Sequence, residues 1–589
     1  MRQFFKFMLA SMAGFILTIL IMFFFLTIFI ASVASMAGKK EVAISEKTLL
    51  HLKFDKVIPE RSPVGPFQFS SSSIFETTNV PGLLETMDLI KKASEDKNIA
   101  GIYLEMSNIP SGMATLEEIR NELLEFKKSG KFIYAYGEVY SQKAYYLASV
   151  ADKILVNPQG SIDFKGLSGQ VMFFKGLLDK LDVNAQIIRH GKYKSAIEPF
   201  ITDKMSDANK EQTLTYVGSI WNHMVDQIGM TRKLDKELMM RAADSLLLET
   251  PEDAVRLGFA DQIAYKDQFI DLIKSAAGID KDDKVKLVSL SKYKDVRPSV
   301  VPKRSKNKIA IIYATGDIVS GEGNQDNLSS ERISKAIRKA RMDSTIKAIV
   351  FRINSPGGSA LASEVILREV KLAAETKPFV ASMGDYAASG GYYIACAADT
   401  ILANPTTLTG SIGVFGIIPD MQNFFRNKLG ITFDNVKTNE NSDYMTVTRP
   451  MTSYEEKVIT NQIERIYSTF VNHVSEGRSM PAAGVDSIGQ GRVWSGIDGL
   501  RINLVDKTGG LRNAIAVAAS MANLEDYRTV GLPEQKDPLT ELLEGFSGDT
   551  QDVKLKESLG VFYPVYKEVQ SLTNAKGVQA RLPFIIEVE

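Results

Sequence analysis

A single serine stands among very small residues in the stretch GDYAASGGYYIACAAD, which runs from Gly384 to Asp399. Small neighbours would let a substrate backbone reach the hydroxyl group of that residue, Ser389. The preceding run KPFVASM is typical of a short buried strand, and we expect a helix to begin near the serine. Unpaired N–H groups at a helix start can receive the oxyanion that forms when a hydroxyl attacks a carbonyl. The alternative is a tight turn that only packs a helix against a sheet.

A glycine pair one strand earlier could complete such a site. In RINSPGGSALASE, Gly357 and Gly358 follow Pro356, between an expected strand and an expected helix. Glycines at this point let a ligand backbone approach closely and can direct N–H groups toward it. A nucleophile and N–H donors at neighbouring strand ends would suit acyl transfer. Taken singly, each motif fits an ordinary turn of an α/β domain better.

A serine nucleophile also needs a base, and the sequence offers few. His473 is the only histidine after Ser389, and its segment YSTFVNHVSEGRS is typical of an ordinary packing helix. Four widely separated histidines and one cysteine, Cys396, leave little material for a metal site or a histidine-based triad, and none for a disulfide. Lysine is the other option, because Ser–Lys pairs are a variant of the catalytic triad.

The elements that must position these residues occur twice along the chain. GEVYSQKAYYLASVADKILVNPQGSI, from Gly137, aligns with GDYAASGGYYIACAADTILANPTTLTGSI, from Gly384, and flanking segments match in the same order. Apolar strand patterns alternate with helical spacing in each copy, which predicts parallel strands joined by helical crossovers. The predicted fold class is therefore α/β, with two tandem repeats. Gln142 stands in the first copy where Ser389 stands in the second.

The N-terminus and the composition bound the setting of these repeats. The uncharged segment from Phe7 to Gly38 exceeds the roughly 20 apolar residues that span a bilayer, so we expect a retained anchor. Flanking charges mildly favour a cytoplasmic N-terminus. A formal net charge of zero without a long basic run makes nucleic acid an unexpected partner. The predicted organisation is a cytoplasmic start and transmembrane anchor (1–38), an N-terminal repeat (45–290), a linker (291–307), a C-terminal repeat (308–530) and a C-terminal extension (531–589).

Four motifs together resemble the signal peptide peptidase A (protease IV) family in its long, duplicated form. They are GKYKSAIEPF, INSPGGSALASE, MGDYAASGGYYIA and TGSIGVFG, and the resemblance covers nearly the whole chain. It implies a fold like that of Clp protease and crotonase. It also implies a Ser–Lys dyad, with Ser389 as the nucleophile and Lys194 as the base, and a hydroxyl at Ser411 that orients the lysine amine.

The same resemblance implies an oxyanion hole and a biological setting. The hole would be built from the backbone N–H groups of Gly357, Gly358 and Gly390. The implied activity is that of a serine endopeptidase, without metal or cofactor, that digests cleaved signal peptides and other peptides. The implied form is a homotetramer anchored by a single pass in the bacterial inner (cytoplasmic) membrane, with the N-terminus in the cytoplasm and the bulk in the periplasm.

The duplication offers an independent argument for one composite site. In the second copy the region equivalent to YKSAIEPF is NENSDYMTV, which has no lysine, while the first copy lacks the serine. Each half therefore lacks what the other supplies. Lys194 must be neutral to act as a base, so we expect it to be buried, because burial lowers the pKa of a lysine. A catalytically silent membrane scaffold is the rival from another class, and acyl-CoA chemistry on the same fold is a second.

Overall fold

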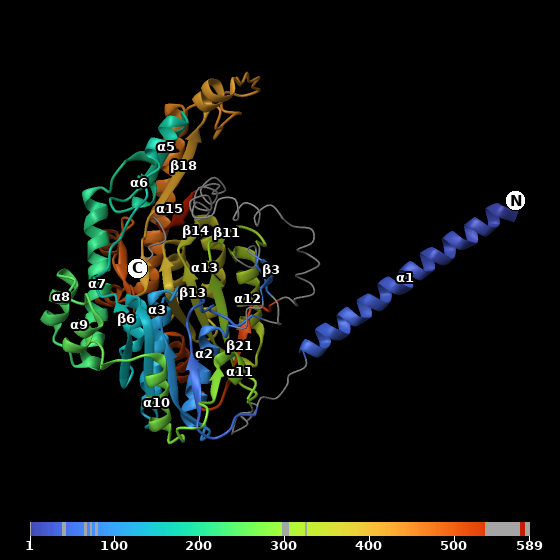
Figure 1. The fold of residues 1–589 in the computed structure, drawn as a ribbon. Helices are drawn as coiled ribbons and strands as arrows, with labels where there is room; N and C mark the ends of the chain where they lie inside the picture. The colour runs from blue at the N-terminus through green and yellow to red at the C-terminus, as the bar shows by residue number, and fades with distance from the viewer. Residues whose placement is uncertain are drawn as a thin grey trace.

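The computed structural model describes residues 2–37, 43–63, 68–70, 73–76, 80–296, 305–323, 327–535 and 578–582. Helix α1 (Arg2–Ala37) extends away from the body of the molecule (Figure 1). Its segment Gln3–Phe25 has a mean hydropathy of 2.4 and is long and apolar enough to cross a membrane. The apolar helix predicted at the N-terminus is therefore present. Residues 297–304 of the predicted linker and most of the predicted C-terminal extension lie outside the described residues.

The first repeat forms a six-stranded parallel sheet. Its central strands are short apolar runs buried on both faces, as expected of a parallel sheet covered by helices. In spatial order the strands are β8 (Gln262–Ile263), β6 (Lys153–Ile162), β5 (Phe132–Tyr140), β4 (Ile99–Glu105), β1 (Thr48–Leu52) and β9 (Leu287–Ser289). The crossovers include α2 (Leu83–Glu95), α3 (Met113–Lys127), α4 (Gln142–Ala148) and α9 (Pro251–Arg256), while α7 (Asp207–Arg232) packs alongside.

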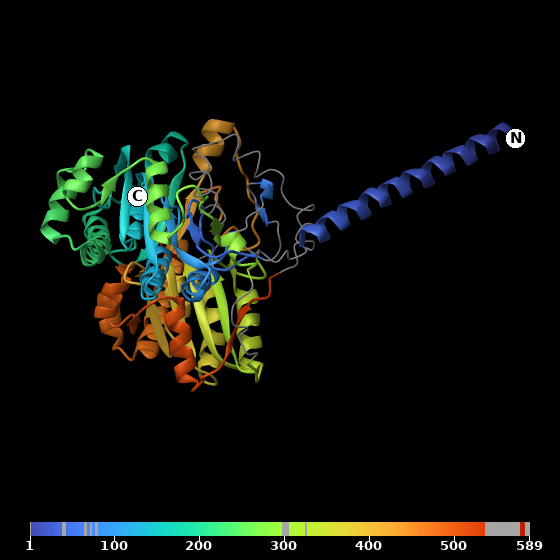
Figure 2. The same ribbon diagram turned by 60° about the horizontal axis from the view of Figure 1, so that its bottom comes forward.

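The second repeat reproduces this order of strands. Its sheet contains β20 (Lys507–Thr508), β16 (Thr400–Ala403), β15 (Phe379–Ala388), β13 (Ile346–Ser355), β10 (Lys308–Thr315) and β21 (Arg528–Leu532), all parallel. Two further strands, β17 (Leu408–Gly410) and β19 (Val493–Ser495), continue the sheet beyond β15. Figure 2 shows the first repeat, blue to green, lying beside the second, yellow to red. The predicted α/β fold of two tandem repeats is confirmed.

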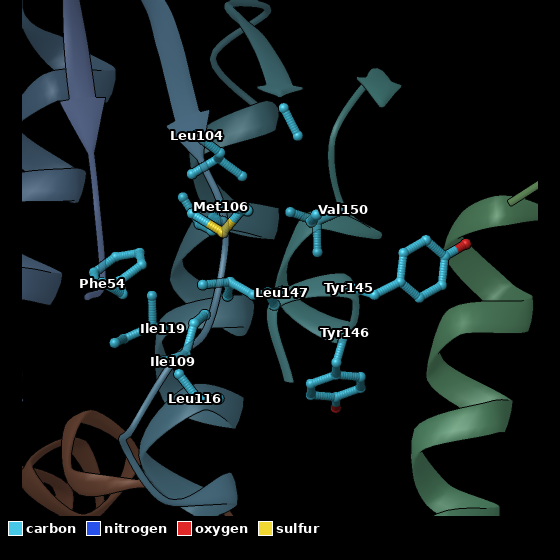
Figure 3. Close-up of a cluster of buried hydrophobic side chains, with 14 of the residues drawn as sticks. Phe54, Leu104, Met106, Ile109, Leu116, Ile119, Tyr145, Tyr146, Leu147 and Val150 are labelled. Atoms are coloured by element: carbon cyan, nitrogen blue, oxygen red, sulfur yellow. The ribbon is translucent and has the colours of Figure 1, made fainter. Parts of the chain in front are cut away.

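Each repeat has its own apolar core, and that core fixes the helix that begins at the end of the third strand. Figure 3 shows part of the first core, where Tyr145 and Tyr146 project from α4. Both tyrosines are fully buried, and the hydroxyl group of Tyr145 donates to the carbonyl of Phe259 at 3.0 Å. In the second repeat, α14 (Gly390–Ala395) is held in the same way, since Tyr392 donates to the carbonyl of Leu504 at 2.9 Å. The start of α14 is therefore a rigid point.

A third sheet joins the two repeats. Its strand order is β12 (Leu328–Ser329), β11 (Ile318–Val319), β14 (Gly357–Ser359), β22 (Gln579–Arg581), β18 (Val414–Asp420) and β7 (Asn184–His190). Only β7 comes from the first repeat, and it pairs antiparallel with β18 along its whole length. The chain that follows β7 is thereby brought against the second repeat.

Candidate active site

Lys194 reaches the second repeat through a turn that follows β7. The amide of Tyr193 donates to the carbonyl of Gln490 at 2.9 Å, so this turn is pinned to the second repeat. Lys194 then packs directly on Gly491, which has a φ of +82°. A Cβ atom built on Gly491 would lie 2.6 Å from the Lys194 Cβ atom, and real structures do not show so close a contact. Glycine is therefore required at position 491 for two reasons: the positive φ angle disfavours other residues, and a side chain would clash with Lys194.

Ser389 occupies the junction between β15 and α14. Its backbone has a φ of 56° and a ψ of −114°, a conformation that residues other than glycine rarely adopt. The surrounding hydrogen bonds hold this conformation. The Ser389 amide donates to the carbonyl of Gly410 at 2.7 Å, and its carbonyl accepts from the amide of Tyr393 at 2.8 Å. The serine hydroxyl is thus presented on a fixed, strained turn, as the sequence pattern of strand, small residues and helix indicated.

The structure brings the lysine and the serine into hydrogen-bond contact within one chain. Nζ of Lys194 lies 2.8 Å from Oγ of Ser389. The same nitrogen lies 3.0 Å from Oγ of Ser411 and 3.3 Å from its carbonyl oxygen. All three residues have no exposed surface. The hydroxyl and carbonyl oxygens of Ser411 can accept the two N–H bonds of a neutral lysine amine. The lone pair of that amine can then face the hydroxyl group of Ser389.

Burial governs the electrostatics of the lysine. Loss of solvent lowers the pKa of Lys194 well below its ordinary value, because a charged amine is poorly solvated in this interior. The nearest acidic residue in sequence, Glu198, does not oppose this shift. Its carboxylate accepts instead from Oγ of Ser206 at 2.6 Å and from Nδ2 of Asn209 at 2.9 Å. Lys194 can therefore be neutral at a pH where a solvated lysine is charged.

The three glycines expected at an oxyanion hole lie around one carbonyl oxygen. A Cβ atom built on Gly357 would meet the carbonyl oxygen of Ala580 at 2.1 Å and the amide nitrogen of Gly390 at 2.9 Å. In the strand pairing, Gly358 is opposite Ala580. The amide of Gly357 itself donates to Oγ of Ser355 at 3.2 Å. Gly390 lies near the same oxygen, since a Cβ atom built on it would be 3.0 Å from the carbonyl oxygen of Ala580.

Strand β22, which carries Ala580, was not foreseen from the sequence. It pairs antiparallel with β14 on one side and with β18 on the other. Three residues are too few to show an alternating pattern, so periodicity could not have identified the strand. The small alanine in GVQARL was the only local signal.

The remaining sequence candidates lie outside the contact between lysine and serine. Gln142 takes the place of the serine in the first repeat. Its side-chain oxygen accepts from the amides of Lys165 and Gly166 at 2.8 and 2.9 Å, so this residue ties down a loop. His473 contacts Nζ of Lys371 at 3.1 Å and Oε2 of Glu364 at 3.0 Å. Both residues have structural partners.

Both repeats of the chain match known proteins. The family model described as Peptidase family S49 matches residues 125–280 and 371–525, one match in each repeat. Protease 4 of Salmonella typhi is 34% identical over 497 residues, covering 82% of this chain and 78% of that protein. The chloroplastic serine protease SPPA of Arabidopsis thaliana is 34% identical over 501 residues, covering 84% and 73%. Among solved structures, a point mutant of ClpP1 from Listeria monocytogenes aligns with a TM-score of 0.24 and 15% identity, over 36% of this chain and 95% of that one. The chain is a serine protease and belongs to peptidase family S49.

Proposed function

We propose that this protein is a membrane-anchored endopeptidase in which Ser389 is the nucleophile and Lys194 is the base. The observation that carries this proposal is the 2.8 Å contact between a fully buried Nζ atom and Oγ of Ser389. A neutral amine at this distance can accept the hydroxyl proton. Ser411 is the positioning residue, because its oxygens hold the amine on the side facing Ser389.

The first half of the proposed reaction forms an acyl-enzyme. Oγ of Ser389 attacks the carbonyl carbon of a peptide bond while its proton passes to Nζ of Lys194. The amides of Gly358 and Gly390 stabilise the oxyanion, and the protonated lysine then gives its proton to the leaving amine. Gly357 contributes through its shape, since a side chain there would fill the space that the substrate carbonyl needs.

The second half returns the enzyme to its starting state. After the leaving peptide departs, the neutral amine of Lys194 takes a proton from water, and the resulting hydroxide attacks the ester carbonyl. The tetrahedral intermediate collapses, Ser389 recovers its proton, and the shortened peptide leaves as a carboxylate. One lysine thus serves as base in both steps, and the reaction requires only the residues already placed here.

The substrates we propose are extended peptides, including cleaved signal peptides. A peptide strand that takes the place of β22 between β14 and β18 would have hydrogen-bonding partners on both edges. The apolar helix α1 would keep this site close to a membrane, where signal peptides remain after cleavage. We further propose a bacterial inner-membrane location, with the body in the periplasm and the chains assembled as a homotetramer.

The test compares three variants with the wild type on a peptide thioester and on a fluorophosphonate probe. Ser389→Ala and Lys194→Ala should each lower kcat by roughly a thousandfold or more while the melting temperature stays near that of the wild type. Lys192→Ala is the matched control, because the amine of that lysine lies over the ring of Tyr193. It should keep activity within a few-fold. Substantial turnover by Lys194→Ala would contradict the assignment, and an unreactive wild type would favour the silent scaffold.

A further inference from the structure

Gln212 is a buried glutamine on α7 that contacts both residues flanking Lys194. The residue has 1% of its surface exposed. Its Nε2 atom donates to the carbonyl of Tyr193 at 2.9 Å and to Oγ of Ser195 at 2.9 Å, with a longer contact of 3.4 Å to Oδ1 of Asn209. A side-chain amide has two N–H donors, so the two short bonds use both. The residues on either side of the proposed base are therefore tied to one side chain of the first repeat.

These contacts support a tight turn that has Lys194 at its centre. The Lys194 backbone has a φ of −73° and a ψ of 76°, and the amide of Ser195 donates to the carbonyl of Tyr193 at 2.8 Å. This combination is an inverse γ-turn. The amide of Lys194 makes a long contact, 3.4 Å, with the carbonyl of Gly191. The Tyr193 carbonyl thus accepts from Ser195 and from Gln212 together, which fixes the direction in which the turn projects the lysine side chain.

The oxygen of the Gln212 amide reaches the second repeat. It accepts from the amide of Val493, at the start of β19, at 3.2 Å. The carbonyl of the preceding residue, Arg492, accepts from the amide of Ser411 at 2.7 Å. These two groups belong to one peptide unit, which is planar and trans, so its N–H and C=O bonds point in opposite directions. A single rigid peptide therefore connects Gln212 to Ser411.

The contacts form a closed path around the base. The path runs from the lysine turn through Gln212 and the rigid peptide to Ser411. It closes at the amine, because Oγ and the carbonyl oxygen of Ser411 lie 3.0 and 3.3 Å from Nζ of Lys194. Gln212 thus holds the backbone of the base and the backbone of the residue that orients it. A side chain this deeply buried is closed to a peptide substrate.

From this geometry we propose that Gln212 is a positioning residue, which fixes Lys194 and Ser411 relative to each other so that Nζ stays aimed at Ser389. The proposal rests on the function proposed above and adds a residue to it. The simpler role for Gln212 is to dock α7 on β19. Ser219, two turns further along α7, has that simpler role, since its Oγ atom lies 2.9 Å from Oγ of Ser495 on the same strand. Gln212 differs from Ser219 by its two bonds beside Lys194.

The test measures hydrolysis of a peptide thioester and the rate of labelling by a fluorophosphonate probe, on the full-length chain purified in detergent. Gln212→Met keeps the length of the side chain and removes its hydrogen bonds. Its kcat should fall roughly 10- to 100-fold, as expected when a base is displaced by about 1 Å. KM should stay near the wild-type value, because Gln212 does not touch the peptide. Labelling should slow by a similar factor, because the probe also needs an activated serine.

Two further variants make the test decisive. Ser219→Ala is the matched control, since it removes a contact between α7 and β19 and should keep the wild-type kcat, KM and labelling rate. Gln212→Glu covers the case in which Gln212→Met folds poorly. It retains the side-chain shape and an acceptor for the amide of Val493, but an ionised carboxylate cannot donate to the carbonyl of Tyr193. Its kcat and labelling rate should also fall while KM is kept.

The outcomes separate this proposal from the proposed function. Wild-type kcat and labelling rate in a folded Gln212 variant overturn the positioning role and leave the peptidase assignment standing. A raised KM with an unchanged kcat also overturns it, because that pattern indicates lost substrate binding. If Ser219→Ala is as slow as Gln212→Met, docking of α7 explains both variants and the proposal fails. A wild type that reacts with neither the thioester nor the probe overturns the two proposals together.

Discussion

Lys194 has to meet two requirements that oppose each other in water. A base must be strong enough to take a serine proton, yet at working pH it must not already be protonated. Burial resolves the conflict by lowering the pKa of the amine without adding a charged neighbour. The cost is a folded state that disfavours protonation of one lysine, and that cost has a measurable dependence on pH.

The activity of the wild type should follow the protonation of Lys194. Activity should rise with pH through the lowered pKa of the amine and then level off, because only the neutral form accepts a proton. The measurement is kcat/KM for a peptide thioester across the pH range. An activity that stays constant down to mild acid would contradict a lysine base. An activity that climbs until about pH 10 would instead place the amine at its ordinary pKa.

The pH dependence of protein stability is an independent test of the lowered pKa of Lys194. The folded-state pKa of Lys194 lies below its unfolded value near 10.4, so between the two values the unfolded state binds more protons and stability rises with pH. Lys194→Met removes this group. The melting temperature of the variant minus that of the wild type should therefore be largest at the acid end of the interval and shrink as pH approaches about 10.4. A difference independent of pH would show that burial does not depress the pKa.

At the scale of elements, a single close contact positions the base. The pairing of β7 with β18 brings the chain of the first repeat against the second repeat. The close contact with Gly491 then fixes the position of Lys194 relative to Ser389. Gly491→Ala should displace the lysine and lower kcat by about 100-fold, since a shift near 1 Å is enough for such a loss. Gly430→Ala is the matched control. Its φ is also positive, at +67°, but nothing lies within 4 Å of the added methyl group.

The two glycine variants therefore share their backbone strain and differ in their contact with Lys194. Each should lose about 1 kcal/mol of stability from a non-glycine residue in the left-handed region. Only Gly491→Ala should lose activity, measured on the same thioester as kcat per folded molecule. Equal activity in both variants would mean that the lysine tolerates displacement, and the positional argument would fail.

Local elements were the part of this fold that the sequence predicted best. The run KAIVFRI lies in β13, ASEVILREVKLAAET closely matches α13 (Ala360–Ala374), and KPFVASM begins β15. Their apolar spacing determines these elements whatever surrounds them. The contact between Lys194 and Ser389 followed from the resemblance and from the complementary losses of the two repeats. Periodicity alone places each residue near an end of its element, but it does not say which ends meet.

The features that escaped prediction depend on long-range contacts. Strand β22 exists because β14 and β18 offer it two edges, and its own three residues carry no pattern. The amide of Gly357 is used by Ser355, a neighbour two positions away whose side-chain direction the sequence does not reveal. Such features are set by tertiary packing after the strands have formed.

At the scale of the whole molecule, the composite site requires that the two repeats stay in fixed register. A buried guanidinium holds them together. Arg352, on β13 of the second repeat, has no exposed surface and pairs with Glu60 and Glu118 of the first repeat, each at 2.8 Å. Glu118 also accepts from the amide of Leu511 at 2.6 Å and from Nδ2 of Asn404 at 3.1 Å, so its carboxylate contacts three residues of the second repeat. Burial raises the pKa of Glu118 even with this partner.

Arg352→Met should therefore destabilise the molecule and separate its two half-sites. Removing one partner of a buried ion pair costs about 3–5 kcal/mol, because the remaining carboxylates stay buried without a counter-charge. Arg241→Met is the control, since the pair of Arg241 with Glu237 is largely exposed and should contribute about 1 kcal/mol or less.

Combining Arg352→Met with Glu60→Gln and Glu118→Gln removes the unpaired charges and should recover part of the lost melting temperature. Melting temperature and kcat per folded molecule must both be measured, because activity needs Lys194 of one repeat in contact with Ser389 of the other. If Arg352→Met lowers the melting temperature but leaves kcat per folded molecule unchanged, the ion pairs stabilise the protein without setting its register. If the triple variant recovers stability without activity, the charges themselves position the repeats, and neutral hydrogen bonds do not replace them.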